Sequence, residues 1–246
     1  QTEGYDGSSW SSRPNLGTAV LQHAGAGASN ASAVSFGGYT TTQTAATEEF
    51  TSSINVITGA AWASGGNMSQ ARTQVAGAGI QTAALAFGGI APGSGDTTEK
   101  YDGSSWTNGG NLGTARYRLA GCGIQTAALA FGGLPESSPQ ANLTATEEYG
   151  GSSWTAGGNL STARSALAGT GVQTAALAYG GDVPDKTVTE EYDGSSWTTG
   201  GSMNTGKFFM AIGGAGTQTA ALASGGSTGP STTVTAVTEA YDGTSW

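Results

Sequence analysis

The fold is decided by the stretch Asn111-Leu-Gly-Thr-Ala-Arg-Tyr-Arg-Leu-Ala-Gly-Cys-Gly-Ile-Gln-Thr-Ala-Ala-Leu-Ala-Phe-Gly-Gly133, which Thr146-Glu-Glu-Tyr149 and Ser152-Ser-Trp154 complete. Five near-copies of this unit fill the 246 residues. A period of about 40–50 residues with strand-like content predicts a small sheet repeated around an axis, a β-propeller. The closing glycine doublets lie 51, 44, 48 and 45 residues apart, at Gly37-Gly38, Gly88-Gly89, Gly132-Gly133, Gly180-Gly181 and Gly225-Gly226.

Each unit contains four segments of strand type, called a to d from the inner to the outer edge of a blade. Segment a follows the Asn-Leu pair, as in residues 164–171, and phrases such as Ala-Gly-Ala-Gly79 are expected to turn into segment b. Segment b alternates, with Ala83, Leu85 and Phe87 on one face. Segment c carries Thr-Glu-Glu-Tyr, and an Asp-Gly turn leads to segment d. We expect one all-β domain with five four-stranded blades, at about 16–62, 67–106, 111–154, 159–197 and 202–246.

The strand count leaves alternatives open. Five a–b pairs are present but six c–d pairs, because residues 1–10 and 238–246 both carry a Thr-Glu-x-Tyr-Asp-Gly-x-Ser-Trp unit. Residues 1–10 are therefore predicted to form a terminal hairpin. Six blades, or a fragment of a longer array, are the alternatives to five blades. Gln1 begins in the middle of a repeat, which favours a mature or excised piece of a longer chain.

The amino-acid composition narrows the classes of function that are expected. The chain has 8 basic and 17 acidic residues and a net charge of −9, so a nucleic-acid partner is not expected. A single cysteine, Cys122, forms no disulfide within the chain, and a single histidine, His23, leaves little metal or acid–base chemistry. We expect no cofactor and no metal. No run of about 18 apolar residues occurs, so no membrane insertion is expected.

The repeats resemble the kelch family. The resemblance rests on a glycine doublet followed by a Tyr and then a Trp, as in Gly88-Gly89, Tyr101 and Trp106. The phrases Gln-Thr-Ala-Ala-Leu-Ala-Phe-Gly-Gly and Thr-Glu-Glu-Tyr are also similar to kelch-like repeats in structural proteins of marine bacteriophages. That resemblance implies a module of a virion or tail fibre, extracellular and facing the host. The copper radical oxidase of the kelch-like group needs more His and Cys residues than His23 and Cys122 supply.

Two charged patterns are weighed for chemistry. Asp102 to Trp106 resembles the aspartate box of sialidase-like propellers but is one residue shorter, and that box is a turn motif. Repeated charges are expected at one end of the blades, either as exposed ion pairs contributing about 0–1 kcal/mol each or as an anion-binding crown. These axial charges, which we interpret as structural, are Arg72, Arg116, Arg164 and Lys207, with Glu49, Glu99, Glu148, Glu190 and Glu239. Because catalysis needs a unique, asymmetric set of groups, we expect no catalytic residues.

The loops between segments b and c differ between copies, whereas their flanking strands are nearly identical. Variable loops on a rigid scaffold are typical of binding sites, although neutral drift is the alternative. The loops span residues 39–46, 90–97, 134–145, 182–188 and 227–237. The candidate ligand-binding residues are Tyr39, Glu136, Asn142, Asp182, Asp185, Lys186 and Ser231.

The preferred function is non-enzymatic adhesion to a host-surface glycan or protein. One rival is a purely structural role that binds other virion proteins, and a more distant rival is an enzyme acting on polysaccharide. The ligand, the host and the oligomeric state stay open at this point.

Overall fold

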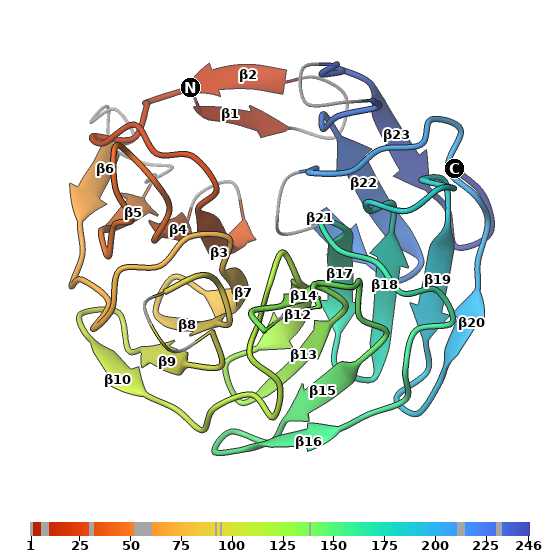
Figure 1. Cartoon of the computed structure of the whole chain (residues 1–246). Coiled ribbons are helices and arrows are strands. Elements are labelled where there is room, and N and C mark those ends of the chain that lie inside the picture. The colour runs from red at the N-terminus through yellow and green to blue at the C-terminus, as the bar shows by residue number, and fades with distance from the viewer. Residues whose placement is uncertain are drawn as a thin grey trace.

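The computed structural model describes residues 2–5, 10–29, 32–51, 61–91, 93, 95–137, 139–210, 215–229 and 233–246. The described part contains strands and turns but no helix. Its antiparallel sheets form a five-bladed β-propeller, which confirms the fold expected from the repeats. Figure 1 shows the blades around a common centre, each running from an inner strand near that centre to an outer strand at the rim.

The first four blades have four strands each and the fifth has three. Blade 1 comprises β3 (Ala24–Ser29), β4 (Ser32–Phe36), β5 (Thr47–Thr51) and β6 (Ala61–Ser64). Blade 2 comprises β7 (Ala76–Ile80), β8 (Ala83–Phe87), β9 (Thr98–Tyr101) and β10 (Trp106–Asn108). Blade 3 comprises β12 (Ala120–Ile124), β13 (Ala127–Phe131), β15 (Thr146–Tyr149) and β16 (Trp154–Ala156). Blade 4 comprises β17 (Ala168–Val172), β18 (Ala175–Tyr179), β19 (Thr189–Tyr192) and β20 (Trp197–Thr199). Blade 5 comprises β21 (Ala215–Thr217), β22 (Ala220–Ser224) and β23 (Thr238–Tyr241).

Two short sheets stand outside the blades. The N-terminal hairpin, predicted over residues 1–10, consists of β1 (Thr2–Tyr5) and β2 (Trp10–Arg13), so its second strand begins at Trp10 and extends beyond the predicted end. It lies between blade 5 and blade 1 (Figure 1). The second pair joins β11 (Arg116–Tyr117) to β14 (Leu134–Pro135), on the loops of blade 3. In the first copy, residues 51–61 stand in place of the short Asp-Gly turn between segments c and d, and residues 52–60 of this insertion lie outside the described residues.

The inner strand of blade 4 starts later than the sequence suggested. Segment a was expected over residues 164–171, but β17 begins at Ala168. The Gly-rich phrases are part of this strand and not turns, since β7 includes Gly77 and Gly79. A Cβ atom on Gly77 would lie 2.8 Å from Cζ of Phe36 in blade 1. Glycine is therefore required there because the preceding blade packs an aromatic ring against the strand.

Neighbouring blades are joined by the same contacts at each interior interface. Between blades 3 and 4, Trp197 Nε1 donates to Thr146 Oγ1 at 3.0 Å, and the Trp197 ring lies 4.9 Å from that of Phe131. Gln173 Nε2 donates to the carbonyl oxygen of Tyr149 at 2.9 Å. These side chains recur in every repeat because they bury the face of one blade against the next.

Ion pairs are buried inside the blades. In blade 4, Arg164 Nη2 lies 2.9 Å from Glu190 Oε1, and Arg164 Nη1 donates to the carbonyls of Gly180 and Val188 at 3.2 and 2.8 Å. Glu190 Oε2 accepts the backbone N–H of Ser161 at 2.7 Å. Burial lowers the pKa of Arg164 to about 10, while Glu190 raises it. Each pair therefore joins the loop before the inner strand to the loop between segments b and c.

The expected partners were partly wrong. Glu148 accepts the hydroxyl of Tyr192 at 2.5 Å, and Glu49 accepts the hydroxyl of Tyr101, so both lie one residue out of register. Successive side chains of a strand point to opposite faces, so only the preceding glutamate reaches the arginine. The ion pairs of the basic residues are buried, so they are neither exposed at the surface nor arranged as an open anion-binding crown. The remaining pairs are Arg72–Glu99, Arg116–Glu147 and Lys207–Glu239.

Candidate functional site

The dipeptide after each segment-a basic residue, or after Val20 in blade 1, differs in all five repeats. Its first residue is joined through the backbone to the residue after the glycine doublet, as in the bridge between Leu21 and Tyr39 and the 2.7 Å bond from Asp182 N to the Ser165 carbonyl. The two kinds of loop at this end of the blades therefore form one surface, called the axial face below. The dipeptides are Leu21-Gln22, Thr73-Gln74, Tyr117-Arg118, Ser165-Ala166 and Phe208-Phe209.

The second residue of each dipeptide has a left-handed backbone. In the described part of the chain, the non-glycine residues with positive φ are Gln22 (53°), Gln74 (56°), Arg118 (54°), Ala166 (53°) and Phe209 (50°). Such a conformation costs an L-residue roughly 1–2 kcal/mol. Backbone hydrogen bonds compensate: Gln74 donates to Gln22 at 3.1 Å, Arg118 to Gln74 at 3.3 Å, Ala166 to Arg118 at 2.8 Å and Phe209 to Ala166 at 2.9 Å. We call these five residues the axial ring.

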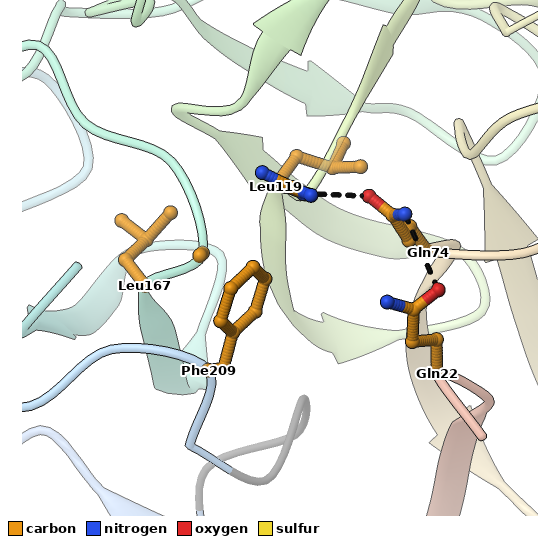
Figure 2. A pocket seen from close by; sticks show the side chains of 7 residues that line it. Gln22, Gln74, Leu119, Leu167 and Phe209 are labelled. Atoms are coloured by element: carbon orange, nitrogen blue, oxygen red, sulfur yellow. Dashed lines mark hydrogen bonds between the residues drawn. The ribbon is translucent and has the colours of Figure 1, made fainter. Parts of the chain in front are cut away.

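The axial ring surrounds a pocket at the centre of the propeller (Figure 2). Figure 2 shows Phe209 and Leu167 on one side of the pocket, across from Gln22 and Gln74 on the other. Because the backbone geometry repeats while the side chains vary, the five blades supply two glutamines, an arginine, an alanine and a phenylalanine to one cavity. The residues that line it are Gln22, Gln74, Arg118, Leu119, Ala166, Leu167 and Phe209.

Arg118 links the polar and aromatic sides of this pocket. Its Nε donates to Gln74 Oε1 at 2.8 Å, and its guanidinium lies 4.8 Å from the centre of the Phe209 ring. Gln74 Nε2 in turn donates to Gln22 Oε1 at 3.3 Å. Neither Nη atom of Arg118 bonds to a described residue. The pocket therefore offers a planar cation, amides and an aromatic face, which suit a ligand bearing hydroxyl or carboxylate groups.

The structure ties neighbouring b–c loops to one another through two of the predicted residues. Glu136 Oε2 accepts the backbone N–H of Gly95 from blade 2 at 3.1 Å. Asn142 Nδ2 donates to the carbonyl of Asp182 from blade 4 at 2.7 Å. These contacts brace the axial face, so Glu136 and Asn142 are already engaged within the protein.

The other predicted residues are spread over the same face. Asp185 Oδ1 accepts the N–H and hydroxyl of Thr187, which lowers the pKa of Asp185, and so shapes its own turn. Lys186 donates to the carbonyl of Val183 at 3.1 Å and lies 5.5 Å from the Phe208 ring. Tyr39 is exposed. Ser231 lies outside the described residues, and none of the other predicted residues lines the central pocket.

Metal-ligating side chains do not cluster in the ranges that the structure describes. No group of three or more His, Cys, Asp or Glu residues there is placed to hold a metal ion. Cys122 is buried in β12, and burial raises the pKa of its thiol to about 12. Burial also lowers the pKa of His23, whose Nδ1 lies 2.8 Å from Ser35 Oγ. In the same part of the chain, no helix is long and apolar enough to cross a membrane.

The sequence contained a signal for the axial ring that the loop comparison missed. The b–c loops stand out by length, whereas the axial residues sit two positions after the segment-a basic residue, or after Val20 in blade 1, in a segment of nearly constant length. A column-by-column comparison of the copies would have shown that these two positions vary between similar flanks. Only the structure shows that the five second positions meet at one point.

The chain matches no protein-family model, and it matches no curated protein sequence.

Proposed function

We propose that this propeller is a non-enzymatic recognition module whose axial face binds a ligand on a host cell surface. One observation carries the proposal: differences between the repeats gather on this face, while every interior interface between blades uses the same Trp–Thr hydrogen bond. The kelch-like resemblance to bacteriophage structural proteins supports a place on a virion, outside the cell.

A surface glycan suits the pocket better than an apolar ligand. Glutamine amides and a guanidinium bond to hydroxyl or carboxylate oxygens, and an aromatic ring packs against the C–H face of a sugar. Arg118, Gln22 and Phe209 supply these groups at the rim. Polysaccharide hydrolysis is less favoured, because Glu136 and Asp185 are engaged by backbone N–H groups and share no pocket.

The test is binding of the fluorescently labelled chain to a panel of intact marine bacteria and their isolated surface polysaccharides. We expect saturable binding to a few strains, competed by soluble polysaccharide. The double variant Arg118→Ala, Phe209→Ala should lose at least tenfold in affinity. The matched control is Ile124→Ala, Val172→Ala, which changes two exposed residues at the opposite end of the blades. Equal binding by both variants, or none by the unchanged chain, would refute the proposal.

An assembly role within a virion is the second candidate. It is favoured by the incomplete packing between blade 5 and blade 1, described below. In that case the N-terminal hairpin matters more than the axial pocket, and deleting residues 1–10 should change the oligomeric state measured by sedimentation.

A further inference from the structure

One face of blade 5 is uncovered although its sequence matches that of a covered strand. β18 and β22 both contain Ala-Ala-Leu-Ala. Leu177 in β18 is fully buried against blade 5, whereas the equivalent Leu222 in β22 is only half-buried. Blade 5 therefore presents a surface that each earlier blade buries under the next.

The outer part of the same face shows the same difference. Thr189 is 1 % exposed and accepts the indole N–H of Trp246 from blade 5 at 3.0 Å. Its equivalent, Thr238 at the start of β23, is exposed. The inner strands of neighbouring blades pack side by side from β3 through β7, β12 and β17 to β21, but β21 and β3 do not. We call this region, between blade 5 and blade 1, the seam.

The N-terminal hairpin that lies at the seam is the outer half of a blade. β1 has the sequence Thr-Glu-Gly-Tyr, and its Tyr5 pairs with Trp10 as Tyr192 pairs with Trp197 in blade 4. In complete blades the inner edge of this strand is paired with segment b. Among the described residues, no strand pairs with that edge of β1. An open strand edge is a template for another strand.

The axial hydrogen bonds are interrupted at the same place. Each ring residue from Gln74 to Phe209 donates its N–H to the residue before it. In the described residues, no bond joins the N–H of Gln22 to the carbonyl of Phe209. One more ring residue, donating to Phe209 and accepting from Gln22, would continue the pattern.

We propose that the seam is a docking site for a β-hairpin of the repeat's own a–b type, which pairs with β1 and completes a sixth blade. Residues 164–181 exemplify such a hairpin. Its Gln173 would donate to the carbonyls of Ala221 and Tyr241 of blade 5, as Gln173 of blade 4 donates to the carbonyls of Ala128 and Tyr149 of blade 3. Its Leu167 and small alanines would cover Leu222. Backbone pairing supplies affinity, and the glutamine and alanine positions supply specificity.

The test is titration of the full chain with a fluorescein-labelled synthetic peptide of residues 164–181. We expect saturable one-to-one binding and a rise in the melting temperature that grows with peptide concentration. A scrambled peptide of the same composition should not bind. Amide hydrogen exchange should slow in β1 when the peptide is present.

Two chain variants locate the binding. Leu222→Asp, at a half-buried position, should weaken peptide binding at least tenfold while the chain stays folded by circular dichroism. Val172→Asp, at an exposed position on blade 4, should leave binding unchanged. Absence of saturable binding to the unchanged chain, or equal binding to both variants, would overturn the proposal. So would a dimer of the unchanged chain that Leu222→Asp dissociates without any peptide binding, since the seam would then join two copies. The recognition proposal is judged separately, by the axial variants.

Discussion

Interior blades and blades that border the seam carry the same repeat in different surroundings. Leu177 and Leu222 occupy equivalent positions in nearly identical strands, yet only Leu177 is fully buried. Glu190 pairs with Arg164 and also accepts backbone N–H groups, whereas blade 1 has Val20 in place of the arginine and its Glu48 keeps the bonds from the N–H groups of Gly17 and Thr18. The difference shows that burial of a repeat residue depends on the neighbouring blade more than on the repeat itself.

The largest expected effect comes from breaking an interior ion pair. Arg164→Ala leaves Glu190 buried without its partner and should lower the free energy of unfolding by about 3–5 kcal/mol. Arg164→Lys is the matched control, because Lys207 already fills this place in blade 5, 3.2 Å from Glu239. Arg164→Lys should lower the free energy of unfolding clearly less than Arg164→Ala does. Urea denaturation measures both, and a loss below about 1 kcal/mol for Arg164→Ala would contradict the role of the pair.

The seam comparison is tested directly by truncating the two leucines. Leu177→Ala removes a fully buried side chain and should cost about 2–5 kcal/mol. Leu222→Ala removes a half-buried one and should cost about 1 kcal/mol or less. Both values come from chemical denaturation of otherwise identical chains. Equal losses would mean that the face of blade 5 is covered in solution.

A smaller effect is expected from the tyrosines that join neighbouring blades. Tyr192 donates to Glu148, but for the equivalent Tyr149 the acceptor position of the preceding blade is Lys100, where blades 1, 3 and 4 have Glu. The buried hydroxyl of Tyr149 has no acceptor among the described residues. Tyr192→Phe should cost about 1–2 kcal/mol and Tyr149→Phe almost nothing. Lys100→Glu should add about 1 kcal/mol of stability.

A double-mutant cycle checks that assignment. In the Lys100→Glu background, Tyr149→Phe should become costly, since the new carboxylate would then lose its donor. Additive effects of the two substitutions would show that no hydrogen bond forms between them.

The smallest expected effect is at a turn. Asp193 Oδ1 accepts the N–H groups of Ser195 and Ser196 at 2.8 Å, but blade 3 has Gly150 at this position. A Cβ atom on Gly150 would meet nothing closer than 4.0 Å. Gly150→Asp should therefore raise the melting temperature by about 1–4 °C, through turn hydrogen bonds and a less flexible unfolded chain. Gly150→Ala is the control that separates the two contributions.

The gain from Gly150→Asp should depend on pH. The backbone hydrogen bonds from Ser196 and the hydrogen bonds from Ser195 lower the pKa of Asp193 to about 2. A carboxylate with a lowered pKa in the folded state stabilises above its unfolded pKa of about 3.9, and this contribution is lost as the pH falls towards 2. The advantage over Gly150→Ala should thus be present at pH 7 and absent near pH 2. A constant advantage would exclude the carboxylate as its source.

Much of the fold was predictable because the same pattern of strands and turns occurs in five copies of the repeat. The glycine doublets, the segment-b phrase and the Tyr–Trp pairs gave the blade count and strand order, and the variable b–c loops indicated the axial face. The start of segment a was missed, because an arginine-led segment looks strand-like although its side chain is buried under the loops. The partner glutamates were assigned one residue out of register because spacing alone does not say which face of a strand points inward.

The sequence by itself thus determined the propeller, its repeated interfaces and the face where the copies differ, since these follow from local patterns that recur at a fixed period. The tertiary structure alone decided that Gln22, Gln74, Arg118, Ala166 and Phe209 converge on one pocket. It also decided that blade 5 and the N-terminal hairpin meet at an incompletely packed seam. Both depend on how blades close around an axis, and contacts between residues so distant in the chain are not encoded in any single repeat.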